Sequence, residues 1–143
     1  MANFRVGENK SGCKPKAWNK ATTTSVVQAG DMMFASSGEA VEFASAGSNL
    51  VFIGVASENS PSGEAMVNIY EAKGSGLELE LVMDLDTSTA VVQGANLAWS
   101  SSQTVTASDT DPLFRCSKSN SGSDANEVHV CMKASQLFQG DAS

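Results

Sequence analysis

The sequence predicts an all-β fold, an antiparallel β-barrel or sandwich made of two similar halves and preceded by an extended N-terminal arm. Short runs rich in Val, Ile, Phe and Leu alternate with clusters of Gly, Ser, Asn and Asp about every eight to twelve residues, which is typical of such folds. One strand pattern occurs twice, and the first twenty residues differ in charge from the rest. No segment has the periodicity of a helix.

The internal repeat is read from an ungapped alignment. Residues Thr22–Ser37 align with Thr87–Ser102, 65 positions on, with a shared Val-Val-Gln and with Phe34 opposite Trp99. Frequent Ser, Thr, Ala and Val make a chance match the alternative reading. One long period indicates a duplicated half-domain, so we expect halves of about 21–76 and 86–134. Further on, the alignment places Val41 opposite Val105, and Val67 and Ile69 opposite Val130 and Met132.

The strands follow from apolar runs and from alternation. In Leu77–Met83 the odd positions are apolar and two even positions, Glu78 and Glu80, are acidic, so one side of this strand should be buried. Turns are expected at 36–38, 60–63 and 73–76, and a polar loop at Ser117–Asn126. The strands that we expect are Ser25–Gln28, Met32–Ala35, Ala40–Phe43, Leu50–Ala56, Ala65–Tyr70, Leu77–Met83, Ala90–Gln93, Leu97–Ser100, Thr104–Ala107, Leu113–Ser117 and Glu127–Met132. Phe34 and Trp99 are assigned to the core.

Charge separates residues 1–20 from residues 21–143. The chain of 143 residues has a net charge of −7, yet its first twenty residues hold five basic residues and one acidic residue, a net of +4, which leaves −11 for the rest. This segment contains Gly7, Gly12 and Pro15 and two aromatic residues, Phe4 and Trp18, that could anchor it. We expect a basic arm that becomes ordered on a surface. The alternative is a frayed terminus without a role.

Several classes of protein are disfavoured. No run approaches the roughly 18 apolar residues of a spanning helix, and the N-terminus lacks the apolar stretch of a signal peptide, so no membrane partner is expected. The acidic body would repel phosphates, so nucleic acid is not an expected partner. Cys13, Cys116 and Cys131 form an odd set without CxxC spacing, which argues against a disulfide framework and a zinc site, and the last two should act as small apolar strand residues.

No catalytic motif is recognisable, and we expect neither an enzyme nor a cofactor. The single histidine, His129, lies in an alternating run and is expected to face solvent. The pairs Asp84/Asp86 and Asp109/Asp111 could bind a hard cation, but they lack the further ligands of a calcium loop, so no metal is expected. They remain the candidates for a small hydrolase with carboxylates assembled in space.

Part of the chain resembles a known family. Gly30–Met33, Val41, Ile53–Ala56 and Ser62–Ile69 follow a recurrent order: a Gly-Asp turn into a strand, an apolar-Gly-Val-Ala strand, and a Gly-Glu turn into an alternating strand. This order resembles the small all-β capsid decoration (cement) proteins of tailed phages. The second half departs from it, with Phe114–Ser117 in place of Ile53–Ala56.

The resemblance implies a tulip-like β-barrel, usually a homotrimer, that sits on the outer surface of a virion head assembled in the host cytoplasm. Such a protein stabilises the capsid by bridging neighbouring major capsid proteins. We therefore expect the basic arm to carry contacts with the capsid or with a neighbouring subunit, through Phe4, Arg5, Lys14, Lys16 and Trp18. The alternative function is a ligand- or glycan-binding β module of a virion fibre or surface.

Overall fold

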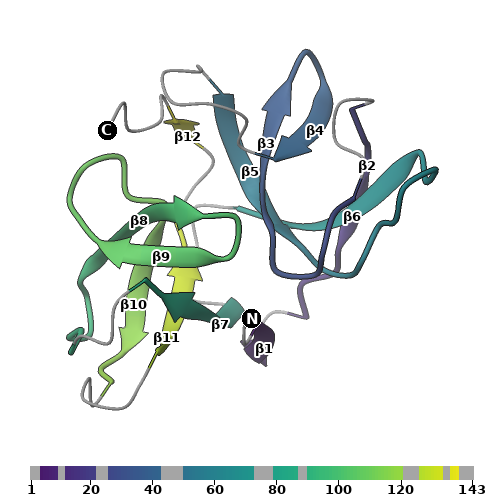
Figure 1. Ribbon diagram of the computed structural model, residues 1–143. Coiled ribbons are helices and arrows are strands. Elements are labelled where there is room, and N and C mark those ends of the chain that lie inside the picture. Colours follow the sequence, from purple (N-terminus) through teal and green to yellow (C-terminus); the bar gives the residue numbers. More distant parts are fainter. Residues whose placement is uncertain are drawn as a thin grey trace. The chain divides into compact units, whose positions relative to one another are not determined.

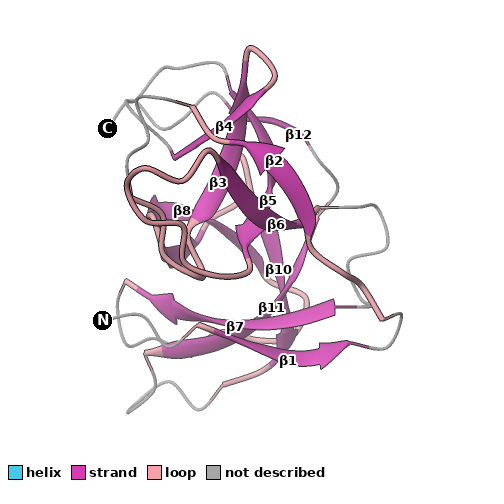
Figure 2. Cartoon of the chain, turned by 90° about the vertical axis from the view of Figure 1, so that its right-hand side faces the viewer, coloured by secondary structure: helices cyan, strands magenta, loops and turns pink. Residues whose placement is uncertain are grey.

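The computed structural model describes residues 4–9, 12–21, 26–42, 50–72, 79–86, 90–120, 126–133 and 136–138, and every regular element among them is a β-strand (Figure 2). Among these residues no helix has the length and apolarity needed to cross a membrane. The strands are β1 (Arg5–Asn9), β2 (Lys16–Asn19), β3 (Met32–Ser36), β4 (Glu39–Glu42), β5 (Leu50–Ala56), β6 (Met66–Glu71), β7 (Leu79–Leu85), β8 (Asn96–Ser101), β9 (Thr104–Ala107), β10 (Phe114–Lys118), β11 (Glu127–Met132) and β12 (Gln136–Phe138).

The chain divides into two compact units, each with its own sheet (Figure 1). Unit 1 comprises residues 1–13 and 73–134, and unit 2 comprises residues 14–72 and 135–143. The chain therefore begins in unit 1, forms most of unit 2, returns to unit 1 and contributes β12 to unit 2. Neither unit is one continuous piece of sequence.

Unit 1 is a closed β-barrel with one additional strand. Its sheet has the order β1-β7-β11-β10-β8-β9, and a further pairing of β7 with β9 closes the last five strands into a barrel. This closing pair, Asp84 with Thr104 and Leu85 with Val105, is parallel, so the fold is mixed rather than purely antiparallel as expected. Strand β1 pairs with the other part of the same β7 edge, placing Arg5 opposite Val82 and Asn9 opposite Leu79.

Unit 2 has the sheet order β2-β6-β5-β3-β4, with β12 paired to β5. A parallel bridge between Lys20 and Ala40 brings β2 to β4, and the Ala21 N–H donates to the Ala40 carbonyl over 3.0 Å. Trp18 and Ala35 pack against the buried core of unit 2. This core cluster consists of Val27, Met33, Ala40, Ile53, Ala56, Val67 and Ile69.

The two units repeat one topology. Strands β2 to β6 pair with one another in the same order as β7 to β11, and the parallel contact recurs at the same place, Lys20–Ala40 in unit 2 and Leu85–Val105 in unit 1. The β2–β6 register sets Trp18 opposite Val67, and the β7–β11 register sets Met83 opposite Val128 in the same way. The repeat thus runs over β2–β6 and β7–β11, so it begins before the expected boundary at residue 21.

The pairings shift the sequence alignment slightly. Gly30 (φ 97°) donates its N–H to the Ala56 carbonyl, and Gly94 (φ 96°) donates to Cys116, so Gly30 corresponds to Gly94 instead of Ala95. A register irregularity between Trp99 and Ser101 then restores the original offset. Phe34 consequently corresponds to Ala98 and is fully buried, whereas Trp99 is only half-buried, contrary to its assignment to the core.

The strand pairings also change which residues of β6 and β11 correspond to each other. Val67 and Ile69 match Val128 and Val130, two positions before the alignment placed them, and all four side chains are buried. Gly54 corresponds to Phe114, because Gly54 pairs with Met33 of β3 and Phe114 pairs with Leu97, the equivalent residue of β8.

Within residues 1–20, β1 and β2 are extended strands, and both are hydrogen-bonded into the sheets. β1 is an outer strand of unit 1, and β2 is an outer strand of unit 2 that reaches β4 only at Lys20. Two other segments, Ser25–Gln28 and Ala90–Gln93, are not strands where they are described; Val27 forms only an isolated bridge with Ser60. Residues 22–25, 43, 73–78 and 121–125, which include expected strand ends, the 73–76 turn and part of the polar loop, lie outside the described residues.

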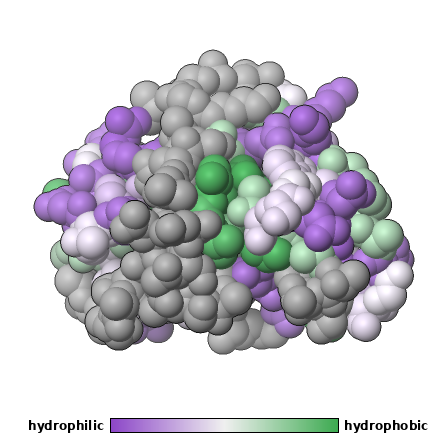
Figure 3. Space-filling model, turned by 90° about the horizontal axis from the view of Figure 1, so that it is seen from above, coloured by the Kyte–Doolittle hydropathy of each residue, from purple (hydrophilic) through white to green (hydrophobic). Residues whose placement is uncertain are grey.

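The surface seen in Figure 3 combines hydrophilic residues with a smaller hydrophobic area. Across the described residues, the large apolar side chains that are exposed are Val26, Val51, Met66 and Val92. They come from different strands and loops of both units.

Candidate binding surfaces

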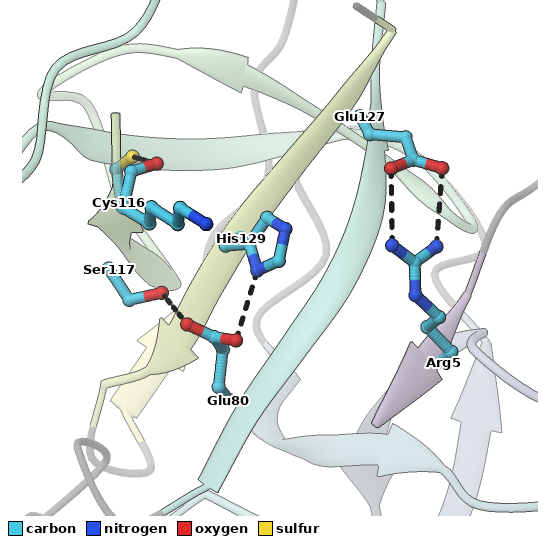
Figure 4. A network of polar contacts seen from close by, with 7 residues as sticks. Arg5, Glu80, Cys116, Ser117, Glu127 and His129 are labelled. Atoms are coloured by element: carbon cyan, nitrogen blue, oxygen red, sulfur yellow. Dashed lines mark hydrogen bonds and ion pairs between the residues drawn. The ribbon is translucent and has the colours of Figure 1, made fainter. Parts of the chain in front are cut away.

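The outer side of unit 1 carries a network of polar contacts drawn from four strands (Figure 4). Glu80 of β7 is its centre. The Ser117 hydroxyl donates to Glu80 Oε2 over 2.8 Å, and His129 Nδ1 lies 3.0 Å from Glu80 Oε1. His129 therefore does not simply face solvent, since its side chain is 28% exposed and is tied to a carboxylate.

The electrostatics of Glu80 follow from these partners. Burial raises the pKa of the Glu80 carboxyl, but hydrogen bonds from His129 and Ser117, helped by the charges of His129 and Lys118, outweigh it and hold that pKa below its ordinary value. Glu80 consequently stays ionised at neutral pH. Because the carboxylate lies between Ser117 and His129, this is not the relay of a hydrolase, in which the histidine lies between the hydroxyl and the acid.

Strand β1 is held on this side of unit 1 by two features. The Arg5 guanidinium donates to both carboxylate oxygens of Glu127, over 3.2 and 3.4 Å, on an exposed surface. Gly7 lies directly against Glu80, because a Cβ on Gly7 would be 2.4 Å from Glu80 Oε1. Gly7 thus leaves the room that the carboxylate occupies.

Unit 2 has a basic outer strand with a polar contact at its end. Lys14 and Lys16 are exposed, and Lys16 Nζ lies 4.0 Å from Glu71 Oε2. The Trp18 ring packs against the core cluster while its Nε1–H donates to the same Glu71 oxygen over 3.0 Å. Trp18 is therefore anchored in its own unit, with only part of the ring accessible.

The five residues expected to carry contacts do not form one cluster within a unit. Phe4, which is half-buried, and Arg5 belong to unit 1, whereas Lys14, Lys16 and Trp18 belong to unit 2. The Glu80 network was not predicted. Alternation did place Glu80 away from its neighbouring leucines and His129 away from Val128 and Val130, but the strand order that brings the two together is not visible in sequence.

Of the two candidate acidic pairs, Asp84/Asp86 lines a cavity and Asp109/Asp111 does not. A polar cavity of about 420 Å³ in unit 1 is lined by Asp84, Leu85, Asp86, Ser100, Ser101, Thr104 and Asn126. Ser100 donates its hydroxyl to Asp86 over 3.2 Å. Asp109 instead accepts a hydrogen bond from Asn96, and neither it nor Asp111 is among the residues lining this cavity.

The remaining candidate groups are structural. Cys116 and Cys131 are buried, as expected, and burial raises the pKa of both thiols. Lys20 is buried and donates its ammonium to the Ser60 and Pro61 carbonyls and to the Ser60 hydroxyl. Over the described residues, no three His, Cys, Asp or Glu side chains are grouped so that they could hold a metal ion.

These features define an all-β protein with two topologically equivalent units and an exposed basic strand in the second. No protein-family model matches the sequence, and no curated protein matches it.

Proposed function

We infer that the protein is a structural virion protein that decorates the outer surface of a phage head and stabilises the capsid by bridging neighbouring major capsid proteins. The proposal starts from the resemblance of Gly30–Ile69 to capsid decoration proteins. That stretch lies entirely in unit 2, where it supplies most of the core cluster.

The observation that carries the proposal is the difference between two equivalent strands. In β7 of unit 1 the inward positions Leu79, Leu81 and Met83 are buried. The registers make Leu81 and Met83 equivalent to Lys16 and Trp18. The same offset of 65 positions matches Leu79 with Lys14, which precedes β2, and both lysines are exposed. One fold therefore has an apolar strand in one unit and a basic, aromatic strand in the other, as a surface that binds an acidic partner would require.

The physical basis would be many weak contacts acting together. Charged side chains on an exposed strand contribute little each, but repetition over a symmetric shell multiplies the number of contacts that must break before the shell opens. A homotrimer would add to this avidity, with the major capsid protein and further copies of this chain as the partners.

Binding to undecorated heads tests the proposal. The double variant Lys14→Ala/Lys16→Ala should bind heads at least about tenfold more weakly than wild type in a co-sedimentation assay. Lys118→Ala, which removes an exposed lysine of unit 1, is the matched control and should bind normally. Wild-type protein that does not bind heads would refute the proposal, and equal binding of all three proteins would refute the role of β2.

A second candidate, binding of a glycan, is favoured by the cavity of unit 1. Its carboxylates, hydroxyls and amide are groups that hydrogen-bond sugar hydroxyls. Titration calorimetry against host surface polysaccharide, with Asp84→Ala/Asp86→Ala as the variant, tests this candidate. Binding that the variant abolishes would favour it over head decoration.

A further inference from the structure

The internal repeat shows that an edge occupied in unit 1 is open in unit 2. In unit 1, β7 pairs with β11 on one side and, over residues 79–82, with β1 on the other. In unit 2, β2 pairs with β6 on the equivalent side. Among the residues that the structure describes, no strand pairs with the opposite edge of β2 before the bridge at Lys20.

The hydrogen bonds fix which backbone groups point to this edge. The Lys20 N–H donates to the Ala65 carbonyl of the β6 side, whereas the Ala21 N–H donates to Ala40 on the other side. Because successive residues of a strand point in opposite directions, Trp18 and Lys16 share the orientation of Lys20, and Ala17 and Asn19 share that of Ala21. Ala17 therefore presents its N–H and its carbonyl to the open edge and is exposed, whereas the Asn19 carbonyl faces Ala40 in the parallel bridge centred on Lys20.

The equivalent backbone position in unit 1 already binds a strand. Val82 pairs with His129 as Ala17 pairs with Asn68, so Val82 and Ala17 are equivalent, and Val82 is the residue that pairs with Arg5 of β1. The donors and acceptors at Ala17 thus have the orientation that accepts an added strand in the other copy of the same fold.

The side chains select the kind of strand that can be added. Pro15 offers no N–H, and Lys14 and Lys16 place two positive charges along the edge, an arrangement that discourages pairing with another basic or apolar edge. A strand with acidic side chains would meet these lysines favourably. The Lys16 ammonium lies 4.0 Å from a Glu71 carboxylate oxygen, but the Lys16 side chain is 69% exposed. Its charge is therefore accessible to a further acidic partner.

We propose that the open edge of β2, at Ala17, binds an extended acidic segment of another protein as an added β-strand. The inference rests on the proposed function for the identity of that protein. Backbone hydrogen bonds of the added strand would supply affinity, and Lys14 and Lys16 would supply the preference for acidic residues.

The experiment uses the full chain and a short synthetic peptide of alternating valine and glutamate, with a peptide of valine and lysine as its control. Amide hydrogen exchange followed by NMR should show a fast Ala17 amide in the free protein and a slow one with the acidic peptide. The Trp18 amide, which points to β6, should be slow throughout. Ala17→Pro removes the outward N–H and should weaken peptide binding by about tenfold or more.

Several outcomes would overturn the inference. These are an Ala17 amide that is already slow in dilute protein, an Ala17→Pro variant that keeps its thermal stability and binds normally, and equal binding of the lysine peptide. Protection of Ala17 that rises with protein concentration alone would overturn it in favour of a second copy as the occupant.

Failure of the inference and failure of the proposed function can be told apart with heads. If the protein binds the acidic peptide at Ala17 but does not bind phage heads, the added strand is supported and the decoration function is refuted. Heads that bind wild type and Ala17→Pro alike would leave decoration standing and refute the added strand.

Discussion

Gly54 has a backbone geometry that its equivalent residue in unit 1 does not share. Its φ is 146°, and a Cβ there would lie 2.0 Å from the Tyr70 carbonyl oxygen of the neighbouring strand. Only glycine fits this close approach of two backbones. The equivalent residue of unit 1 is Phe114, so unit 1 has no such approach, and the Gly in the apolar-Gly-Val-Ala strand is a structural requirement of unit 2 alone.

Gly54→Ala should lower the free energy of unfolding by about 2–3 kcal/mol, because backbone atoms must move apart to admit the methyl group. Gly63→Ala is the matched control, since Gly63 also has a positive φ of 97° but has open space around its Cβ position. It should cost about 1 kcal/mol. Urea unfolding of both variants measures the difference, and equal losses would show that the contact with Tyr70 is unimportant.

Glu42 gives unit 2 a stability that depends on pH. Burial, together with a hydrogen bond to Asp31 and the charge of Asp31, raises the pKa of Glu42 to about 8. Because the folded pKa lies above the unfolded one, the contribution of Glu42 is fully present below about pH 4.5 and is lost as the pH rises to about 8. Wild-type protein should therefore lose stability across this window.

Glu42→Gln should remove that slope and be more stable than wild type at pH 8, by about 1–2 kcal/mol after solvent screening is allowed for. Thermal melts at several pH values between 4.5 and 8 measure the effect. Glu39→Gln, on an exposed position of the same strand, is the control and should keep the wild-type slope. A parallel slope for both variants would contradict the assignment to Glu42.

At the scale of elements, the position of β1 depends on the contact between Gly7 and the Glu80 carboxylate. Gly7→Ala would push the Glu80 carboxylate away from His129 and Ser117, so we expect a loss of about 1–2 kcal/mol in the free energy of unfolding. In a Glu80→Ala background the same substitution should cost much less, because the carboxylate that it displaces is absent. A double-mutant cycle by urea unfolding measures the coupling. Strictly additive losses would contradict the proposed coupling between Gly7 and Glu80.

Elements with an apolar side were predictable, and three strands near the two ends of the sequence were not. β5 and β11 have the expected bounds, because a long apolar run and a regular alternation report burial directly. β1, β2 and β12 were missed. β1 and β2 are mostly exposed, so their sequences carry no alternation, and only pairing with a distant strand makes them extended. Ala90–Gln93 looked like a strand by composition but leads into the turn at Gly94.

The same reasoning explains what could be predicted of the candidate surfaces. Lys14, Lys16 and Trp18 were singled out because charge and aromatic content are local properties of sequence. The open edge beside them depends on the β2–β6 pairing and on comparison with β7, which are long-range properties. The split of the five expected contact residues between the two units has the same cause, since only the topology shows that β1 and β2 join different sheets.

For the whole molecule, each unit is completed by a strand that comes from outside its main stretch of sequence. Unit 1 receives β1 from the N-terminal end and unit 2 receives β12 from the C-terminal end, so each unit depends on a strand that is distant in sequence. Contacts between distant segments have a high cost of loop closure, which the completed sheets must offset.

Removal of residues 1–9 should therefore destabilise unit 1 and leave unit 2 folded. Without β1, the Val82 edge of β7 loses its partner and Glu127 loses Arg5, whereas β2 keeps its pairing with β6. Amide exchange should show faster exchange in β7 and unchanged protection of Trp18. The truncated protein should still bind heads if β2 carries the contact, since Lys14 and Lys16 are retained. Loss of head binding with unit 2 intact would instead assign the contact to Phe4 and Arg5.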